Sequence, residues 1–164
     1  MPVNAIHGRT DISVVAIDFD SRAVQKNHLF VAQKGLSFDG HLFVEKAIEQ
    51  GATVVVCEKM PASFRAGITY VEVGDSNKAL AILASNFYDN PSSKLKLVGI
   101  TGTNGKTTIA SLLFELFKNA GYKVGLLSTV KVVVDKKSYG ATHTTPNSVA
   151  INKYLDEMVA AGVS

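Results

Sequence analysis

The stretch KLKLVGITGTNGKTT, residues 94–108, determines the fold expected for the second half of the chain. An apolar run typical of a strand leads into a polar, glycine-containing segment, and an amphipathic helix follows. The usual phosphate-binding pattern, G-x-x-x-x-G-K-[ST], requires a glycine five positions before Gly105. This chain has Ile100 there, while Gly99 is one position too early and Gly102 is two positions too late. The segment therefore departs from the usual pattern at one position.

The physical requirements of a phosphate loop are nevertheless met. The apolar run 94–100 predicts a strand that leads into the loop, and Gly102 and Gly105 are small enough for backbone N–H groups to turn inward. The N-terminus of the following helix favours negative charge. Lys106 supplies a cation for phosphates, and Thr107 supplies a hydroxyl for Mg²⁺. These residues favour a phosphate loop over an ordinary strand–helix turn, and Lys106 and Thr107 are the candidate catalytic residues.

Strands and helices alternate along the first ninety or so residues. Hydrophobic patterns and helix start and stop signals predict strands over 12–19, 28–35, 52–58 and 69–73, and helices over 39–51 and 75–91. Pro91 and the two serines after it interrupt this pattern. We therefore expect a boundary between a domain of residues 1–92 and a second domain that begins at residue 93.

The second domain, residues 93–164, repeats the alternation. Its pattern predicts strands over 94–100 and 123–129, helices over 106–121 and 144–162, and a hairpin over 131–141. The fold class is therefore α/β: a mixed-sheet N-terminal domain, followed by the start of a parallel-sheet P-loop domain. One β-α-β unit with a hairpin and a helix is too little to bury a three-layer core. Either this second part packs onto the first, or the 164 residues are a piece of a longer protein.

Composition excludes several classes of protein. Apolar residues make up 46% of the chain and charged residues 19%, which argues against a disordered chain. The net charge of +3 is spread along the sequence, so no nucleic-acid partner is expected. The lone Cys57 lies in an apolar run and is expected to be a buried strand residue. No signal peptide or membrane-length apolar run occurs, which predicts a cytoplasmic location without membrane insertion.

Four stretches together resemble a known family. The segment TGTNGKTT (101–108), after its apolar run, resembles the ATP loop of the Mur ligase family, whose members carry T-G-T-x-G-K. Three further stretches are similar to the MurE branch of that family. They are FDSR (19–22), the segment that begins HLFVAQKGLSFDGH and continues to Glu58 (28–58), and HTTPN (143–147). The resemblance covers nearly the whole chain. It implies an enzyme of peptidoglycan precursor synthesis.

The resemblance also implies ATP and Mg²⁺ as cofactors. Lys106 would contact the outer phosphates, and Thr107 would bind Mg²⁺. The full set of residues that would surround ATP is Gly102, Thr103, Asn104, Gly105, Lys106, Thr107 and Thr108.

The implied substrates are UDP-N-acetylmuramoyl-L-alanyl-D-glutamate and a diamino acid, with meso-diaminopimelate favoured over L-lysine. ATP would phosphorylate the D-glutamate side-chain carboxylate, and the amine of the diamino acid would attack the acyl phosphate. The residues implied to contact the UDP-sugar substrate are Phe19 and Ser21, the loop residues Leu36, Ser37 and Phe38, and His143, Thr144 and Thr145.

Other interpretations stay open for these residues. Asp20 and Arg22 are also compatible with a simple turn ion pair, and His28 and His41 with caps or surface residues. Two other classes of protein fit the chain. One is a different P-loop enzyme, such as a MurF-like ligase or a small-molecule kinase, and the other is a non-catalytic UDP-sugar-binding module.

Two further expectations concern the chain by itself. We expect no ligase activity from it alone, because the rest of the ATP-binding domain and the domain that selects the amino acid lie outside it. Apolar surface that the missing strands would cover is expected to promote self-association.

Overall fold

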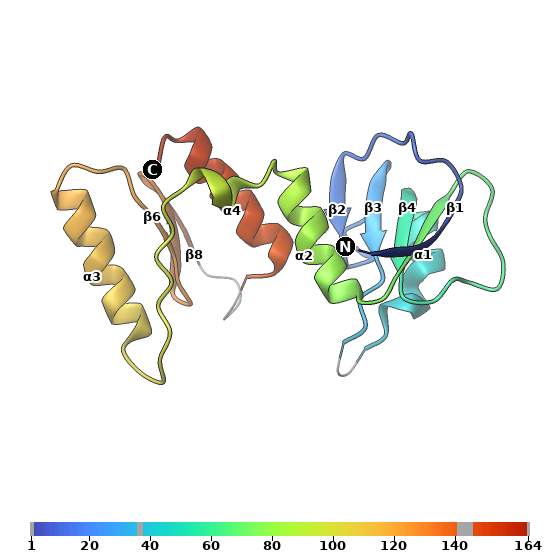
Figure 1. The fold of residues 1–164 in the computed structure, drawn as a ribbon, viewed down its shortest axis with the longest axis horizontal. Coiled ribbons are helices and arrows are strands. Elements are labelled where there is room, and N and C mark those ends of the chain that lie inside the picture. The colour runs from blue at the N-terminus through green and yellow to red at the C-terminus, as the bar shows by residue number, and fades with distance from the viewer. Residues whose placement is uncertain (1, 36–37, 141–145, 164) are drawn as a thin grey trace. The chain divides into compact units, whose positions relative to one another are not determined.

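The structure, a computed structural model, describes residues 2–35, 38–140 and 146–163 (Figure 1). The chain divides into two compact units, Met1–Ala84 and Ser85–Ser164. Each unit contains its own β-sheet. The α/β fold class predicted from the sequence is confirmed, since both sheets are accompanied by helices.

Five strands form the sheet of the first unit, in the order β1-β5-β4-β3-β2. Strands β2 to β5 run parallel, and β1 joins the edge of β5 in the antiparallel direction, which makes the sheet mixed. The carboxyl ends of the four parallel strands therefore lie along one edge of the sheet. The strands are β1 (Val3–His7), β2 (Ala16–Asp18), β3 (His28–Val31), β4 (Ala52–Cys57) and β5 (Thr69–Val73).

Strand β4 lies at the centre of this sheet, as its apolar sequence predicts. Apart from Thr53, every residue of the strand is buried, as expected where both faces of a sheet are covered. Cys57, its last residue, is buried and has no disulfide partner, which confirms the interpretation from sequence. The main core cluster of the unit comprises Val24, Phe30, Ala32, Val44, Ala47, Ala52, Val55, Cys57 and Tyr70.

The two predicted helices of the first unit form with changed bounds. The first is split into a 3₁₀ turn, η1 (Gly40–Phe43), and a short helix, α1 (Val44–Glu49). The second, α2 (Ser76–Phe87), begins where predicted, because the carboxylate of Asp75 accepts the Lys78 N–H at 2.9 Å. It ends earlier than predicted, because Asp89 and Asn90 adopt left-handed conformations that stop a helix.

The second unit contains a three-stranded antiparallel sheet of β6 (Gly125–Leu127), β7 (Lys131–Val134) and β8 (Lys137–Gly140). Helix α3 (Lys106–Asn119) packs on one face and α4 (Ser148–Ala160) on the other, as Figure 1 shows. Alternate residues of β7 explain this arrangement. Val133 packs with Phe114 of α3, whereas Val132 and Val134 pack with Leu155 and Met158 of α4. A short 3₁₀ turn, η2 (Pro91–Lys94), precedes α3.

The strand predicted over 94–100 does not form. The described strands of the second unit pair with one another, and none of them hydrogen-bonds this segment. Leu97 and Val98 are consequently exposed, at 58% and 69%. An apolar run predicts a strand only where a neighbouring strand can pair with it, so the parallel β-loop-α-β unit expected here is replaced by the antiparallel sheet.

One strand that was not predicted and the start of one helix also differ from the prediction. Residues Val3–His7 form the edge strand β1, which the sequence analysis missed because all five residues are exposed and carry no burial pattern. Helix α4 begins at Ser148, because the Asn147 side chain caps it by accepting the Ala150 N–H at 2.8 Å. Pro146 therefore precedes the helix and does not lie in its first turn.

Helix α3 has the amphipathic pattern noted in the sequence, but most of its apolar side chains are not covered. Its apolar stripe includes Leu112 and Leu116, which are 66% and 60% exposed, and among the described residues of the helix only Phe114 is buried. This exposed stripe supports the expected self-association, which stays a prediction. None of the helices in the described part of the chain is long and apolar enough to cross a membrane.

We predict that Phe30→Ala lowers the free energy of unfolding of the first unit by about 3–5 kcal/mol, because Phe30 is only 1% exposed in its core. The matched control is Phe38→Ala, which removes the same side chain where it is 77% exposed and should change stability by less than about 0.5 kcal/mol. Urea unfolding followed by tyrosine fluorescence and circular dichroism measures both. Equal effects of the two substitutions would contradict the core assignment.

Candidate functional site

The turn that opens α3 has the geometry of an anion-binding site. Gly105 is the N-cap residue, with φ of 79°, and Gly102 has φ of 152°, so both lie in the region that favours glycine. The Ile109 N–H bonds the Gly105 carbonyl at 2.9 Å, which makes it the first intrahelical donor. No side chain caps the helix N-terminus. The N–H groups of the first turn, residues 106–108, are therefore left for an external acceptor.

The ammonium group of Lys106 lies over this turn. Its Nζ donates to the carbonyl of Gly102 at 2.5 Å and to that of Thr103 at 3.3 Å. The turn that opens α3 thus carries both a cation and the unpaired N–H groups of residues 106–108. The arrangement suits phosphate oxygens, which accept hydrogen bonds from both kinds of donor.

A second hydroxyl lies near Thr107. The Oγ1 atoms of Thr107 and Thr129 are 3.5 Å apart, with Thr129 located two residues after β6. The neighbouring Ser128 hydroxyl is already used in the turn before β7, where it donates to the Lys131 carbonyl at 2.8 Å. Sequence analysis did not select Thr129. Its position at the end of the strand predicted over 123–129 was the available signal.

Bound ATP requires hydrogen-bond donors for its phosphates, and Mg²⁺ requires oxygen ligands. The free N–H groups and Lys106 fit the phosphates of a nucleotide, and the Thr107 hydroxyl fits one ligand position of Mg²⁺. Within the described residues, no group of three or more His, Cys, Asp or Glu side chains could hold a metal ion. The residues therefore fit a metal that arrives with nucleotide phosphates better than one held by the protein alone.

In the first unit, the predicted residues after β2 form a tight turn. Asp20 pairs with Arg22 through two atoms of the guanidinium, with the shortest contact at 2.7 Å, and also accepts the Arg22 backbone N–H at 2.9 Å. The turn ion pair considered from sequence is thus present. Ser21 between them is 6% exposed, and no described residue hydrogen-bonds its hydroxyl. Phe19 is half-buried.

The residues that follow β3 leave the same carboxyl edge of the first sheet as the turn after β2. Phe38 is 77% exposed, and its carbonyl accepts the Gly35 N–H at 2.9 Å. The turn is closed by the Gly40 N–H, which donates to the Gln33 carbonyl at 2.8 Å. Five residues predicted to contact the substrate lie outside the described residues: Leu36, Ser37, His143, Thr144 and Thr145.

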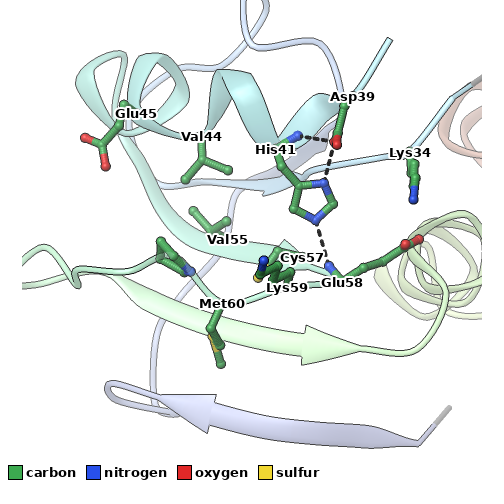
Figure 2. A pocket seen from close by; sticks show the side chains of 11 residues that line it. Lys34, Asp39, His41, Val44, Glu45, Val55, Cys57, Glu58, Lys59 and Met60 are labelled. Atoms are coloured by element: carbon green, nitrogen blue, oxygen red, sulfur yellow. Dashed lines mark hydrogen bonds and ion pairs between the residues drawn. The ribbon is translucent and has the colours of Figure 1, made fainter. Parts of the chain in front are cut away.

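A shallow cavity of about 460 Å³ lies beside the residues that follow β3 and β4 (Figure 2). Apolar side chains such as Val44, Val55 and Met60 line one part, and charged or polar groups such as Lys34 and His41 line another. Burial raises the pKa of the Cys57 thiol, which is in the wall, to about 11. This thiol is therefore protonated at neutral pH and is a poor nucleophile. Sequence analysis did not predict the cavity, because its lining comes from separate elements between Lys34 and Pro61 that only the fold brings together.

His41, interpreted from sequence as a cap or a surface residue, joins two segments. Its Nδ1 is 2.6 Å from Oδ1 of Asp39, and its Nε2 accepts the backbone N–H of Glu58 at 2.9 Å. Because Nε2 accepts a hydrogen bond, the ring proton is assigned to Nδ1, which donates to Asp39. Asp39 also caps η1 by accepting the His41 N–H at 3.0 Å. These bonds lower the pKa of the Asp39 carboxyl, with the backbone N–H of His41 as the largest cause.

The mixed sheet with ligand candidates at its carboxyl edge, and the glycine turn that opens α3, are typical of α/β proteins that bind phosphate-containing ligands. The chain belongs to the Mur ligase family. Residues 13–88 match the family model described as "Mur ligase family, catalytic domain", and residues 100–164 match the model described as "Mur ligase middle domain".

Two curated relatives carry the same name, UDP-N-acetylmuramoyl-L-alanyl-D-glutamate–2,6-diaminopimelate ligase. The protein of Cytophaga hutchinsonii is 55% identical over 159 residues, which is 96% of this chain and 33% of the relative. That of Bacteroides fragilis is 48% identical over 157 residues, which is 96% of this chain and 32% of the relative. The chain thus spans about a third of the length of these relatives.

A solved structure of a protein with the same name superposes with a TM-score of 0.71. The two chains are 22% identical, and the match covers 92% of this chain and 30% of the other. At this identity the likeness shows the fold alone.

We predict that Arg22→Ala raises the pKa of Asp20 from about 2 toward its ordinary value of 3.8, because the Arg22 side chain is the largest cause of the lowering. The pKa is lowered in the folded state, so the contact stabilises the protein above about pH 4 and is lost as the pH falls toward 2. NMR titration of the carboxyl groups measures the pKa. The control Arg9→Ala removes the partner of Asp11 and should leave Asp20 unchanged. An Asp20 that titrates near 3.8 in the unmodified chain would contradict the ion pair.

Proposed function

We propose that the chain supplies the UDP-sugar-binding part and the nucleotide-binding loop of a MurE-type ligase. Such an enzyme uses ATP to join a diamino acid to UDP-N-acetylmuramoyl-L-alanyl-D-glutamate in peptidoglycan synthesis. The observation that carries the proposal is the uncapped N-terminus of α3, preceded by a glycine turn whose carbonyls bond the Lys106 ammonium group. The names of the relatives at 55% and 48% identity support the same reaction.

The first proposed step is activation of a carboxylate, which is a poor electrophile at neutral pH. ATP transfers its γ-phosphoryl group to the D-glutamate side chain, so that ADP leaves and an acyl phosphate forms. The N–H groups of residues 106–108 and the Lys106 ammonium would hold the phosphates and offset the charge that develops on them. Mg²⁺, when bound with the nucleotide, would neutralise further charge, and Thr107 would supply one of its ligands.

In the second proposed step, the amine of the diamino acid attacks the acyl phosphate. The C–N bond forms, the C–O bond to phosphate breaks, and inorganic phosphate leaves with the amine having lost a proton. The relatives' printed names specify 2,6-diaminopimelate, which supports that amino acid over L-lysine.

The UDP-sugar substrate is proposed to bind at the carboxyl edge of the first sheet. Phe19 and Ser21 follow β2, and Phe38 lies in the segment that follows β3, an adjacent parallel strand. Open α/β sheets bind ligands at this edge. Leu36, Ser37, His143, Thr144 and Thr145 complete the proposed set from family resemblance.

The proposed division into domains keeps the bounds predicted from sequence. Residues 1–92 would form the UDP-sugar-binding domain, and residues 93–164 the beginning of the central ATP-binding domain. Because nucleotide sugars and ATP are its proposed substrates, we propose that the enzyme acts in the cytoplasm.

We predict that Lys106→Ala weakens binding of ATP–Mg²⁺ by about tenfold or more, because a charge-assisted hydrogen bond contributes about 1.5–3 kcal/mol. Isothermal titration calorimetry of the whole chain measures this affinity. The control Lys118→Ala removes a lysine at the other end of the same helix and should leave it unchanged. Thr107→Ala should reduce affinity for ATP–Mg²⁺ more than for ATP without the metal, because the Thr107 hydroxyl is the proposed Mg²⁺ ligand. Equal affinities of the unmodified chain and the Lys106 variant would reject the proposed phosphate loop.

We predict that Ser21→Ala weakens binding of UDP-N-acetylmuramoyl-L-alanyl-D-glutamate by roughly five- to tenfold, through loss of one hydrogen bond. Ser63→Ala, at an exposed position of the same unit, is the matched control and should have no effect. The same calorimetric titration measures both variants. If the unmodified chain bound ATP but not the UDP-sugar, the MurE-type assignment would be rejected in favour of another P-loop enzyme.

A further inference from the structure

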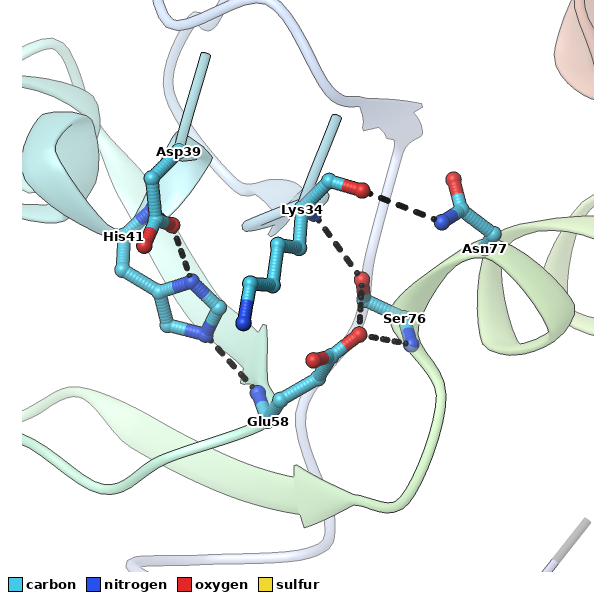
Figure 3. A network of polar contacts seen from close by, with 6 residues as sticks. All are labelled: Lys34, Asp39, His41, Glu58, Ser76 and Asn77. Atoms are coloured by element: carbon cyan, nitrogen blue, oxygen red, sulfur yellow. Dashed lines mark hydrogen bonds and ion pairs between the residues drawn. The ribbon is translucent and has the colours of Figure 1, made fainter. Parts of the chain in front are cut away.

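Glu58 lies at the carboxyl edge of the first sheet, directly after β4. On one side of β4 is β3, followed by the segment Gln33–Gly40, and on the other side is β5, followed by α2. Glu58 therefore lies between two elements that are distant in sequence. Figure 3 shows the polar contacts that it makes with both.

The carboxylate of Glu58 connects to one flank of the segment through Ser76. Its Oε1 accepts the Ser76 N–H at 2.9 Å and the Ser76 hydroxyl at 2.7 Å. The Ser76 Oγ in turn accepts the backbone N–H of Lys34 at 3.2 Å. Ser76 is completely buried, so these bonds are shielded from water. Its N–H and hydroxyl, in that order, lower the pKa of Glu58, which therefore stays ionised at neutral pH.

The backbone of Glu58 connects to the other flank through His41. The Glu58 N–H donates to Nε2 of His41, and Nδ1 of the same ring donates to Asp39. One residue thus reaches both Lys34 and Asp39, which also pair with each other in an isolated antiparallel bridge. The two described flanks of the segment are held by separate atoms of Glu58.

Asn77 adds a contact on the same side. Its Nδ2 donates to the Lys34 carbonyl at 3.3 Å, and its Oδ1 accepts from Nε2 of Gln33 at 2.7 Å. The backbone of Lys34 is therefore bonded through its N–H to Ser76 and through its carbonyl to Asn77. Both partners are in the first turn of α2, so the position of this helix determines where the segment lies.

A role in capping α2 explains only one of these contacts, the bond from the Ser76 N–H to the Glu58 carboxylate. Asp75 already caps the helix, because its Oδ1 accepts the Lys78 N–H at 2.9 Å. The bond from Lys34 to the Ser76 hydroxyl contributes nothing to the helix, since its donor belongs to another segment. The arrangement does orient the segment that carries Phe38, one of the residues proposed to contact the UDP-sugar.

We propose that Glu58 is a positioning residue, which fixes the Gln33–Gly40 segment in the orientation that binds the UDP-sugar substrate. The role in substrate binding rests on the function proposed above. The fixing of the segment can be measured without any substrate, so the two parts can fail separately.

The first experiment measures amide hydrogen exchange by NMR in the whole chain without ligand. Glu58→Ala should speed exchange of the Lys34 amide about tenfold, because the Ser76 hydroxyl loses the carboxylate that orients it. Glu58→Gln should restore protection, since its amide oxygen can accept the same two bonds. Ser76→Ala should also expose the Lys34 amide, while the Asp75 cap and the rest of α2 stay intact. The control Asp11→Ala removes an exposed carboxylate of the same unit and should change none of these rates.

The second experiment titrates the same variants with UDP-N-acetylmuramoyl-L-alanyl-D-glutamate and with ATP–Mg²⁺, well below the unfolding temperature. Glu58→Ala should weaken binding of the UDP-sugar about tenfold, Glu58→Gln should restore most of it, and affinity for ATP should not change. A general loss of folding would reduce both affinities and would not be rescued by glutamine.

Unchanged exchange of Lys34 in both Glu58→Ala and Ser76→Ala would overturn the positioning role, whatever the affinities. Faster exchange with an unchanged affinity for the UDP-sugar would overturn the role in substrate binding. Failure of the unmodified chain to bind the UDP-sugar would instead reject the proposed function, and with it the substrate role of Glu58, while the exchange data would still decide whether Glu58 fixes the segment.

Discussion

The first unit depends on the parallel pairing of β2, β3, β4 and β5, because parallel strands place all their carboxyl ends at one edge. Every segment that leaves this edge must satisfy backbone groups that no longer belong to the sheet. Polar side chains therefore gather there from four separate parts of the sequence. The turn at Asp20 follows β2, the Gln33–Gly40 segment follows β3, Glu58 follows β4 and Ser76 follows β5.

The contacts at this edge are better suited to fixing geometry than to adding stability. A typical hydrogen bond contributes only about 1 kcal/mol to stability, and exposed ion pairs contribute less. The stability of the unit comes mainly from the apolar residues of β4 and its neighbours, which are buried below the edge. Glu58 directly follows the buried strand β4, and Ser76 is itself completely buried. The packed apolar residues of the core therefore support these polar groups. Such support is what a binding site needs if its donors are to stay in place.

The sequence was sufficient for features that depend on local patterns. Apolar patterns or glycine positions in the sequence predict strand β4, the hairpin of β7 and β8, and the start of α3 at Lys106. Features that depend on distant partners were not predictable in this way. Strand β1 exists because β5 offers an edge, and the run 94–100 fails to form a strand because no described strand pairs with it.

The same distinction applies to the site residues. Lys106 and Thr107 could be chosen from spacing alone, since the loop and the helix that position them are contiguous. Glu58 carries no signal in its neighbourhood, because its partners Ser76 and His41 are 18 and 17 residues away in sequence. Only the order of the strands brings these residues together. A hydrogen-bonded group built across strand ends therefore requires the tertiary structure for its detection.

The unusual glycine spacing of the loop can be explained by its backbone. A phosphate loop needs a residue that can adopt a positive φ before the helix, and here Gly102 and Gly105 both do so. Ile100, at the position of the usual early glycine, precedes that turn and is only half-exposed.

Lys106 completes the argument, because its ammonium reaches back to the Gly102 carbonyl, four residues earlier. In this loop the lysine itself therefore bonds the glycine turn. A phosphate that binds the free N–H groups of α3 must compete with the loop carbonyls for this lysine, and the ammonium needs only a rotation of its side chain to move from one acceptor to the other.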